Sequence, residues 1–86
     1  GTVNINKFLN LNKFLLENEF NLNDFIRIYY FKSDRWDLEF KNNLIIKLPF
    51  DNLDESLKKL KKIYNNNQFN NLKIIDLRIG GRIIIK

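Results

Sequence analysis

The chain of 86 residues is long enough for one hydrophobic core, because so short a chain buries only about 60 to 65% of its unfolded surface. It has no cysteine, methionine or histidine, which excludes disulfides, thiolate nucleophiles, the commonest zinc ligands and the usual general base at neutral pH. Its net charge of +5 admits nucleic acid or an anionic membrane surface as a partner.

Apolar periodicity predicts a first helix from Asn4 to about Leu16. Its apolar residues fall within one arc at about 100° per residue, and we expect that arc to face the core. The arc comprises Ile5, Phe8, Leu9, Leu11, Leu15 and Leu16, and Phe14 lies outside it.

Three β-strands are predicted next. The segment "FIRIYYF", residues 25 to 31, is rich in β-branched and aromatic side chains. In "RWDLEFK", residues 35 to 41, apolar and charged residues alternate, so that Trp36 faces a core while Arg35 and Asp37 face water. Asn42 and Asn43 suit a two-residue hairpin turn, because asparagine tolerates positive φ, and "LIIKL" returns as the partner strand until Pro49 ends it.

A second helix is predicted after Asp51, which is a good N-cap residue. Acidic side chains in its first turn and lysines later suit the helix dipole. Its apolar repeat is Leu53, Leu57, Leu60 and Tyr64, and its lysines are Lys58, Lys59, Lys61 and Lys62. We interpret the lysines as a solvated face.

The chain finishes with a predicted hairpin, "LKIIDLRI" and "RIIIK", joined by Gly80 and Gly81. Two glycines between β-branched runs favour a two-residue type I′ turn, since both central residues of that turn need positive φ. Such a turn would put Ile75 and Ile84 on one face of the hairpin, and Asp76 and Ile85 on the other.

The predicted order is therefore α, β, β, β, α, β, β. This order indicates an α+β domain with a mainly antiparallel sheet of about five strands and two helices on one side. We expect residues 1–86 to form a single domain. No apolar run approaches the roughly 18 residues of a transmembrane helix, and the N-terminus lacks the plan of a signal peptide. The chain is thus expected to be soluble in its own right or to be a fragment.

"RWDLEFKNNLIIKLP", then a leucine-repeat helix, then "IIDLRIGGRIIIK" resembles the C-terminal extracytoplasmic β domain of the bacterial cell-division family FtsQ/DivIB, in its alphaproteobacterial form. The similarity extends from about Phe25 to Lys86. Two positions depart from the family pattern: Asn43 replaces the usual turn glycine, and Ile79 stands where members often carry an aromatic residue. The matching positions are Arg35, Trp36, Leu38, Leu48, Pro49, Asp76, Leu77 and Arg78.

This resemblance implies a single-pass inner-membrane protein whose POTRA domain and β domain lie on the periplasmic side. It implies a scaffold that is not an enzyme and has no cofactor or metal. It further implies that the β domain binds the small membrane proteins FtsB and FtsL, chiefly by letting a segment of FtsB add a strand to the edge formed by the last strand.

The residues themselves also favour strand addition at the last strand. A terminal hairpin leaves unpaired backbone groups on its outer strand, and "RIIIK" has no proline or charge inside its apolar run. The alternative is a strand in the middle of the sheet, which is also typical of continuous apolar runs. The predicted partner-binding residues are Arg78, Ile79, Arg82, Ile83, Ile84, Ile85 and Lys86, with Arg35 as a further contact; the basic ones would attract acidic partner residues.

Three other functions stay open from the sequence. The first is a basic α+β module that binds nucleic acid, and the second is an interaction domain of another envelope complex. The third, a catalytic domain that uses carboxylates alone, is disfavoured because no pair of carboxylates has the spacing of an acid/base or metal motif. An exposed isoleucine edge would also favour pairing between two copies of the domain.

Overall fold

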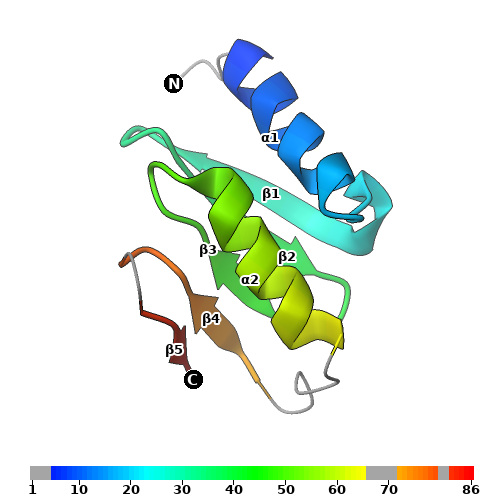
Figure 1. Cartoon of the computed structure of the whole chain (residues 1–86), viewed down its shortest axis with the longest axis vertical. Coiled ribbons are helices and arrows are strands. Elements are labelled where there is room, and N and C mark those ends of the chain that lie inside the picture. The colour runs from blue at the N-terminus through cyan, green and yellow to red at the C-terminus, as the bar shows by residue number, and fades with distance from the viewer. Residues whose placement is uncertain (1–4, 66–71, 80–81) are drawn as a thin grey trace.

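The computed structural model describes residues 5–65, 72–79 and 82–86, which form two α-helices over one face of a β-sheet (Figure 1). The elements are α1 (Ile5–Glu17), the short 3₁₀ helix η1 (Leu22–Asp24), β1 (Phe25–Phe31), β2 (Arg35–Phe40), β3 (Ile45–Lys47), α2 (Leu53–Asn65), β4 (Ile74–Asp76) and β5 (Ile84–Ile85). The α+β class and the order αβββαββ are confirmed.

The described strands form one sheet in the order β1-β2-β3-β4-β5. Neighbours are antiparallel except β3 and β4, which are parallel and are connected by α2. A parallel pair needs such a crossover, because a tight turn can only reverse the chain. The two edges of this sheet are therefore β1 and β5.

The core lies between the helices and the inner face of the sheet. Trp36 and Leu38 of β2 are buried there, as the alternation in that strand predicted. Tyr30 is half-buried and contacts the Trp36 ring at 4.7 Å between centroids, while Tyr29 faces out. Among the residues that the structure describes, nine large side chains are fully buried: Leu11, Leu15, Leu38, Leu44, Ile46, Leu48, Leu57, Leu60 and Ile75.

α1 covers the core with a narrower face than its apolar arc suggested. Leu11 and Leu15 are fully buried and Phe14 also packs against the core, so its placement outside the apolar face was wrong. In contrast, Ile5, Leu9 and Leu16 are each more than half exposed. Periodicity identifies an apolar arc, but where the neighbouring elements lie decides which part of the arc is covered.

The connection from α1 to β1 is fixed by local hydrogen bonds. Glu19 has φ of 65°, and the amides of Glu19 and Phe20 bond back to the carbonyls of Leu16 and Leu15, at 3.1 and 2.8 Å. This is the Schellman pattern that satisfies the last carbonyls of a helix. Phe20 is then buried, and the chain enters β1 through η1.

The turn between β2 and β3 has three residues instead of the predicted two. The Phe40 amide bonds to the Leu44 carbonyl at 2.9 Å, which leaves residues 41–43 in the loop. Asn43 alone of these has positive φ, at 70°. A type I turn followed by one left-handed residue is a common hairpin connection, and it needs one residue that tolerates positive φ rather than two.

α2 begins one residue later than the N-cap assigned to Asp51 implies. The helix starts at Leu53, and the Ser56 amide bonds to the Asn52 carbonyl at 3.0 Å. Asn52 therefore immediately precedes the helix and Asp51 lies outside it. Asp54 in the first turn instead binds Lys58 one turn later, at 3.0 Å.

Candidate partner-binding edge

β5 lies at an edge of the sheet that the described residues form, beside β4 (Figure 1, dark red). Within that part of the chain the prediction of an edge strand is confirmed and the mid-sheet alternative is wrong. Ile83 and Ile85 are 41% and 47% exposed. The surface comprising Arg78, Ile79 and residues 82–86 is called the C-terminal edge below.

The hydrogen bonds between β4 and β5 show which backbone groups of the C-terminal edge are open. The amide and the carbonyl of Lys86 both bond to Ile74, at 3.0 and 3.3 Å. Backbone groups alternate in direction along a strand, so those of Ile84 also face β4 while those of Ile83 and Ile85 face away from the sheet. The outward groups belong to the two exposed isoleucines.

The register of the hairpin differs by one residue from the predicted one. Ile75 lies opposite Ile85, and Asp76 lies opposite Ile84. Because a shift of one residue exchanges the faces, Ile85 lies on the inner side and Ile84 on the outer side, the reverse of the prediction. The two glycines on which the predicted turn rests lie outside the described residues.

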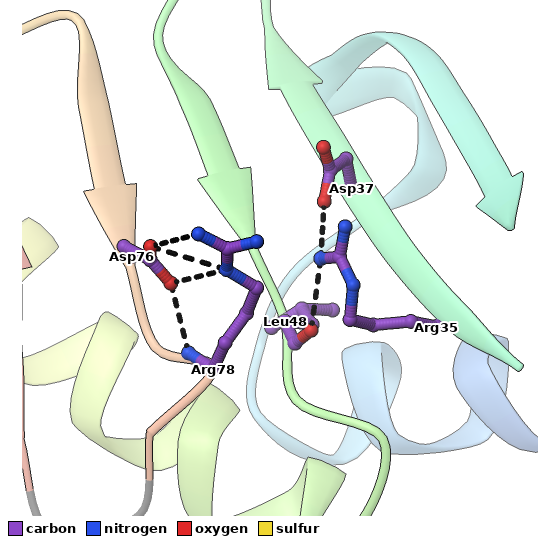
Figure 2. A network of polar contacts seen from close by, with 5 residues as sticks. All are labelled: Arg35, Asp37, Leu48, Asp76 and Arg78. Carbon is purple, nitrogen blue, oxygen red and sulfur yellow. Dashed lines mark hydrogen bonds and ion pairs between the residues drawn. The ribbon is translucent and has the colours of Figure 1, made fainter. Parts of the chain in front are cut away.

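Asp76 supplies a physical reason for this shift. Its carboxylate accepts the Arg78 backbone amide at 3.0 Å and the Arg78 guanidinium at 2.7 to 3.1 Å (Figure 2). The Arg78 amide is thus bonded to a side chain instead of to β5. The Arg82 amide bonds to the Ile79 carbonyl at 3.1 Å. Because Asp76 lies opposite Ile84, residues 77–79 on one side of the hairpin match only residues 82–83 on the other, so the first side has one extra residue.

Charged side chains form a network on the outer face, across β2, β3 and β4. Asp37, Lys47 and Asp76 lie side by side in register on the three strands. Arg35 binds Asp37 at 2.7 Å, and Arg78 binds Asp76 at 2.7 Å. Figure 2 shows both arginines from the outer face, on neighbouring sides of β3.

This network stabilises the charged form of Asp76. The hydrogen bonds from the Arg78 side chain lower the pKa of Asp76 to about 2. The same contact raises the pKa of Arg78, and the charge of Asp37 adds to that effect. Arg78 is therefore held in one orientation by Asp76, although its own side chain is 44% exposed.

Arg35 is held more firmly than the sequence suggested. It lies on β2, and β3 separates it from the C-terminal edge. Its guanidinium bonds to Asp37 and to the Leu48 carbonyl, at 2.7 and 3.2 Å. The prediction that Asp37 stands in water was wrong, because Asp37 is only 8% exposed on a face that carries no helix.

A cavity of about 140 Å³ adjoins the C-terminal edge, between the start of α2 and the hairpin. Leu77 and Ile79 contribute apolar surface, while Glu55, Lys59 and Arg82 bring charge of both signs. The cavity can therefore accept a side chain that has an apolar stem and a polar end.

The structure thus brings most of the predicted partner-binding residues together at the C-terminal edge and leaves Arg35 apart. Sequence reasoning missed Asp37 and Lys47 as members of one charged network with Asp76. The charges alternate visibly along β2, but their neighbours on β3 and β4 follow only from the pairing of the strands.

Two further features bear on the classes of function that the sequence left open. Within residues 5–65, 72–79 and 82–86, no three acidic side chains gather as a metal site would require. In the same part of the chain, no helix combines the length and the apolar character needed to cross a membrane.

A comparison with protein families finds one whose description is Cell division protein FtsQ/DivIB, C-terminal; its profile matches residues 8–78. The match spans most of the chain and includes most of α1, which precedes the segment from Phe25 onward that carries the resemblance. A search of curated proteins finds no match.

Proposed function

Because the chain belongs to the FtsQ/DivIB family of cell-division proteins, we propose that it is a scaffold domain of the division machinery that binds FtsB, together with FtsL, through its C-terminal edge. The family consists of non-enzymatic scaffolds that are anchored in the membrane and carry a periplasmic domain. The full-length protein would accordingly be a single-pass protein of the inner membrane, with this β domain in the periplasm.

The observation that carries the proposal is the open side of β5. The backbone groups of Ile83 and Ile85 face away from β4, as the bonds of Lys86 to Ile74 indicate. A segment of FtsB would add a strand there, and its backbone would supply the missing hydrogen bonds. The exposed isoleucines would contact alternate side chains of that strand, which is how strand addition combines affinity with specificity.

Basic side chains would give this contact a charge preference. Arg78, Arg82 and Lys86 are all exposed beside β5. Asp76 holds the Arg78 guanidinium in place, which lowers the entropy that the arginine loses on binding. An acidic residue of the partner would be attracted to this part of the C-terminal edge, and Arg35 would contribute less because Asp37 and Leu48 already engage it.

An NMR titration tests the proposal. The isotope-labelled domain is titrated with a peptide from the periplasmic C-terminal part of FtsB of the same organism. We expect shifts to concentrate on residues 79 and 82–86 and to be larger at Ile83 and Ile85 than at the α2 lysines. No shift at the C-terminal edge at saturating peptide would contradict the proposal.

A pair of variants separates backbone pairing from side-chain contact. Ile85→Pro removes an outward amide, whereas Ile85→Ala removes most of the side chain and keeps that amide. Since the Ile84 amide faces β4, proline at 85 spares the bonds that hold the hairpin. We expect at least a tenfold loss of affinity for Ile85→Pro and a smaller loss for Ile85→Ala, in domains whose other signals are unchanged; equal losses would argue against strand addition.

The competing function is examined in the same titration. A short single-stranded oligonucleotide replaces the peptide, at low and at physiological salt. Phosphate contacts release counterions, so binding to the α2 lysines would weaken steeply with salt. The nucleic-acid function would replace the scaffold proposal if the oligonucleotide causes salt-sensitive shifts at Lys58, Lys59 and Lys62 while the signals of β5 do not change.

A further inference from the structure

Positive charge is concentrated in the C-terminal part of the chain. Residues 1–55 carry 7 basic and 9 acidic side chains, whereas residues 56–86 carry 8 basic and 1 acidic. A composition rich in lysine explains a high total charge, but it does not explain this separation along the chain. Such an asymmetry indicates contact with an anionic partner.

The fold brings five lysines to one end of the domain. The Ile45 amide bonds to the Lys73 carbonyl and the Lys73 amide to the Lys86 carbonyl, each at 2.9 Å. The turn between β2 and β3 contacts the end of α2, because the Phe40 and Tyr64 rings stack with 5.6 Å between their centroids. Figure 1 shows the ends of α2 and β5 and the start of β4 in the lower part of the view, with the start of α1 at the top. The lysines of this basic end are Lys41, Lys61, Lys62, Lys73 and Lys86.

Most charges of the basic end are available to a partner. All of its lysines except Lys61 are exposed, and none of them forms an ion pair with a residue that the structure describes. Lys61 bonds to the Glu19 carbonyl at 3.1 Å and lies over the Phe20 ring. Away from this end, in contrast, Lys7 and Lys58 each bind an aspartate.

A cavity of about 240 Å³ lies within the basic end, between the turn from β2 to β3 and the end of α2. The Tyr64 ring, which is 41% exposed, contributes an aromatic wall. Asn23, Asn42, Asp24 and Lys41 contribute donors and acceptors of hydrogen bonds. A sugar ring has apolar C–H groups that can pack on an aromatic wall, and hydroxyl or amide groups that such side chains can bind.

The residue types at the basic end distinguish between anionic partners. Protein interfaces are depleted in lysine, and planar recognition of a carboxylate normally uses arginine. Arg27, Arg35 and Arg78 each bind a carboxylate of this chain, and none of them belongs to the basic end. Exposed lysines on several elements instead suit a hydrated polymer whose negative charges are spread along it.

We propose that the basic end binds peptidoglycan, the glycan polymer of the bacterial cell wall whose peptide stems carry free carboxylates. The carboxylates contact the lysines, and an amino sugar of the polymer enters the cavity beside Tyr64. The profile that matches the chain describes the C-terminal part of a membrane-anchored family, so the anchored part precedes α1. Because the start of α1 lies far from the basic end, that end would face away from the membrane (Figure 1). The proposal depends on the periplasmic location proposed above and not on FtsB binding at the C-terminal edge.

Co-sedimentation with purified peptidoglycan sacculi at physiological salt is the first test. The double variant Lys62→Gln, Lys73→Gln removes two charges of the basic end, and Lys13→Gln, Lys32→Gln is the control with the same net charge. We expect the first pair to weaken binding about fivefold or more and the control pair less than about twofold, because a lysine contributes chiefly where it meets the polymer. Equal losses for the two pairs, or no sedimentation of the parent chain, would overturn the proposal.

Two further arms examine the chemistry of the ligand. Sacculi whose carboxylates have been capped as amides should lose most of the binding, and undiminished binding would contradict the proposal. Phosphatidylglycerol vesicles and a single-stranded oligonucleotide then compete for the chain at equal concentrations of negative charge. If either displaces the chain from sacculi more effectively than soluble peptidoglycan fragments do, the surface is not specific for the cell wall and the proposal fails.

An NMR titration with peptidoglycan fragments released by a muramidase examines the cavity. We expect shifts at Lys41, Asn42 and Tyr64, and unchanged signals at Ile83 and Ile85. The FtsB peptide, added next, should still shift the signals of β5, so that failure of one proposal is distinguishable from failure of the other. Unchanged signals at Lys41 and Tyr64 at saturating fragment would overturn the assignment of the basic end.

Discussion

β1 and β5 both lie at an edge of the sheet, but β1 has seven residues and β5 has two. β1 is in register with six residues of β2 and carries α1 on its inner side, whereas β5 matches two residues of β4. The exposed apolar surface beside β1 comes from a helix as well as from a strand, and at β5 it comes from isoleucines of the strand region itself. β1 is therefore a long edge beside a helix, while β5 is a short edge beside basic side chains.

The difference shows how backbone pairing alone leaves the role of an edge undetermined. Both edges offer outward amides and carbonyls, at Ile28 and Tyr30 in β1 and at Ile83 and Ile85 in β5. What distinguishes them is the surface on either side. Basic side chains border β5, and an apolar helix flank borders β1.

The largest expected effect contrasts a side chain of β2, next to the edge strand β1, with a side chain of the edge strand β5. Leu38→Ala removes a fully buried side chain opposite Ile28 of β1 and should lower the free energy of unfolding by about 2 to 5 kcal/mol. Ile85→Ala changes a side chain that is nearly half exposed and should lower it by less than about 1 kcal/mol. Urea denaturation monitored by Trp36 fluorescence measures both; similar losses would mean that β5 is as integral to the core as β2.

A proline pair on β1 is expected to give the next largest effect. Tyr29→Pro removes an amide that bonds to β2 and should cost about 2 to 4 kcal/mol more than Tyr29→Ala. Ile28→Pro, measured against Ile28→Ala in residues 1–86, removes an outward amide and should cost less than half of that. Equal effects in residues 1–86 would show that the register assigned to the outward groups is wrong.

Acid should loosen the β4 end of the sheet through Asp76. Its pKa is about 2 in the folded chain and 3.8 as its ordinary value, so the stabilisation is complete above about pH 4 and is lost as the pH falls from 4 to 2. Asp76→Asn should remove about 1 to 2 kcal/mol at pH 7, less than the full pKa difference because water still screens the pair. The variant and the parent should approach each other in stability near pH 2, as urea titrations at several pH values would reveal; a constant difference between pH 7 and 2 would exclude this linkage.

The smallest effect is expected at the ion pair on β1. Arg27 and Glu39 are 3.5 Å apart and the Arg27 side chain is 63% exposed, whereas Arg78 and Asp76 are 2.7 Å apart and the Arg78 side chain is 44% exposed. Arg27→Gln should therefore change the melting temperature by less than Asp76→Asn does, and within the error of most scans. A larger shift for Arg27→Gln would reverse the ranking of the two pairs.

Local sequence patterns predicted the helices and strands well, because the spacing of apolar residues within each segment is typical of one kind of secondary structure. The alternation around Trp36 predicted the buried face of β2, and the leucine repeat predicted the core face of α2. The residues alone supported an edge position and a mid-sheet position for β5 about equally, and the order of the strands decided between them. The family resemblance favoured the edge, and the fold agrees with it.

The errors concern residues whose surroundings come from elsewhere in the chain. The hairpin register failed because the Asp76 carboxylate takes the Arg78 amide, a side-chain bond that no turn rule includes. Asp37 was assigned to water because its neighbours on β3 and β4 were unknown. The exposure of Ile5, Leu9 and Leu16 depends on where α1 lies relative to β1.

The sequence by itself thus determined which segments are helix or strand and which side chains alternate toward a core, since periodicity and turn residues act over a few positions. Tertiary structure alone decided the order of the strands, the two open edges, the charged network on the outer face and the uncovered flank of α1. Each of these depends on contacts between segments far apart in the chain, and such contacts follow from packing and register that no local pattern specifies.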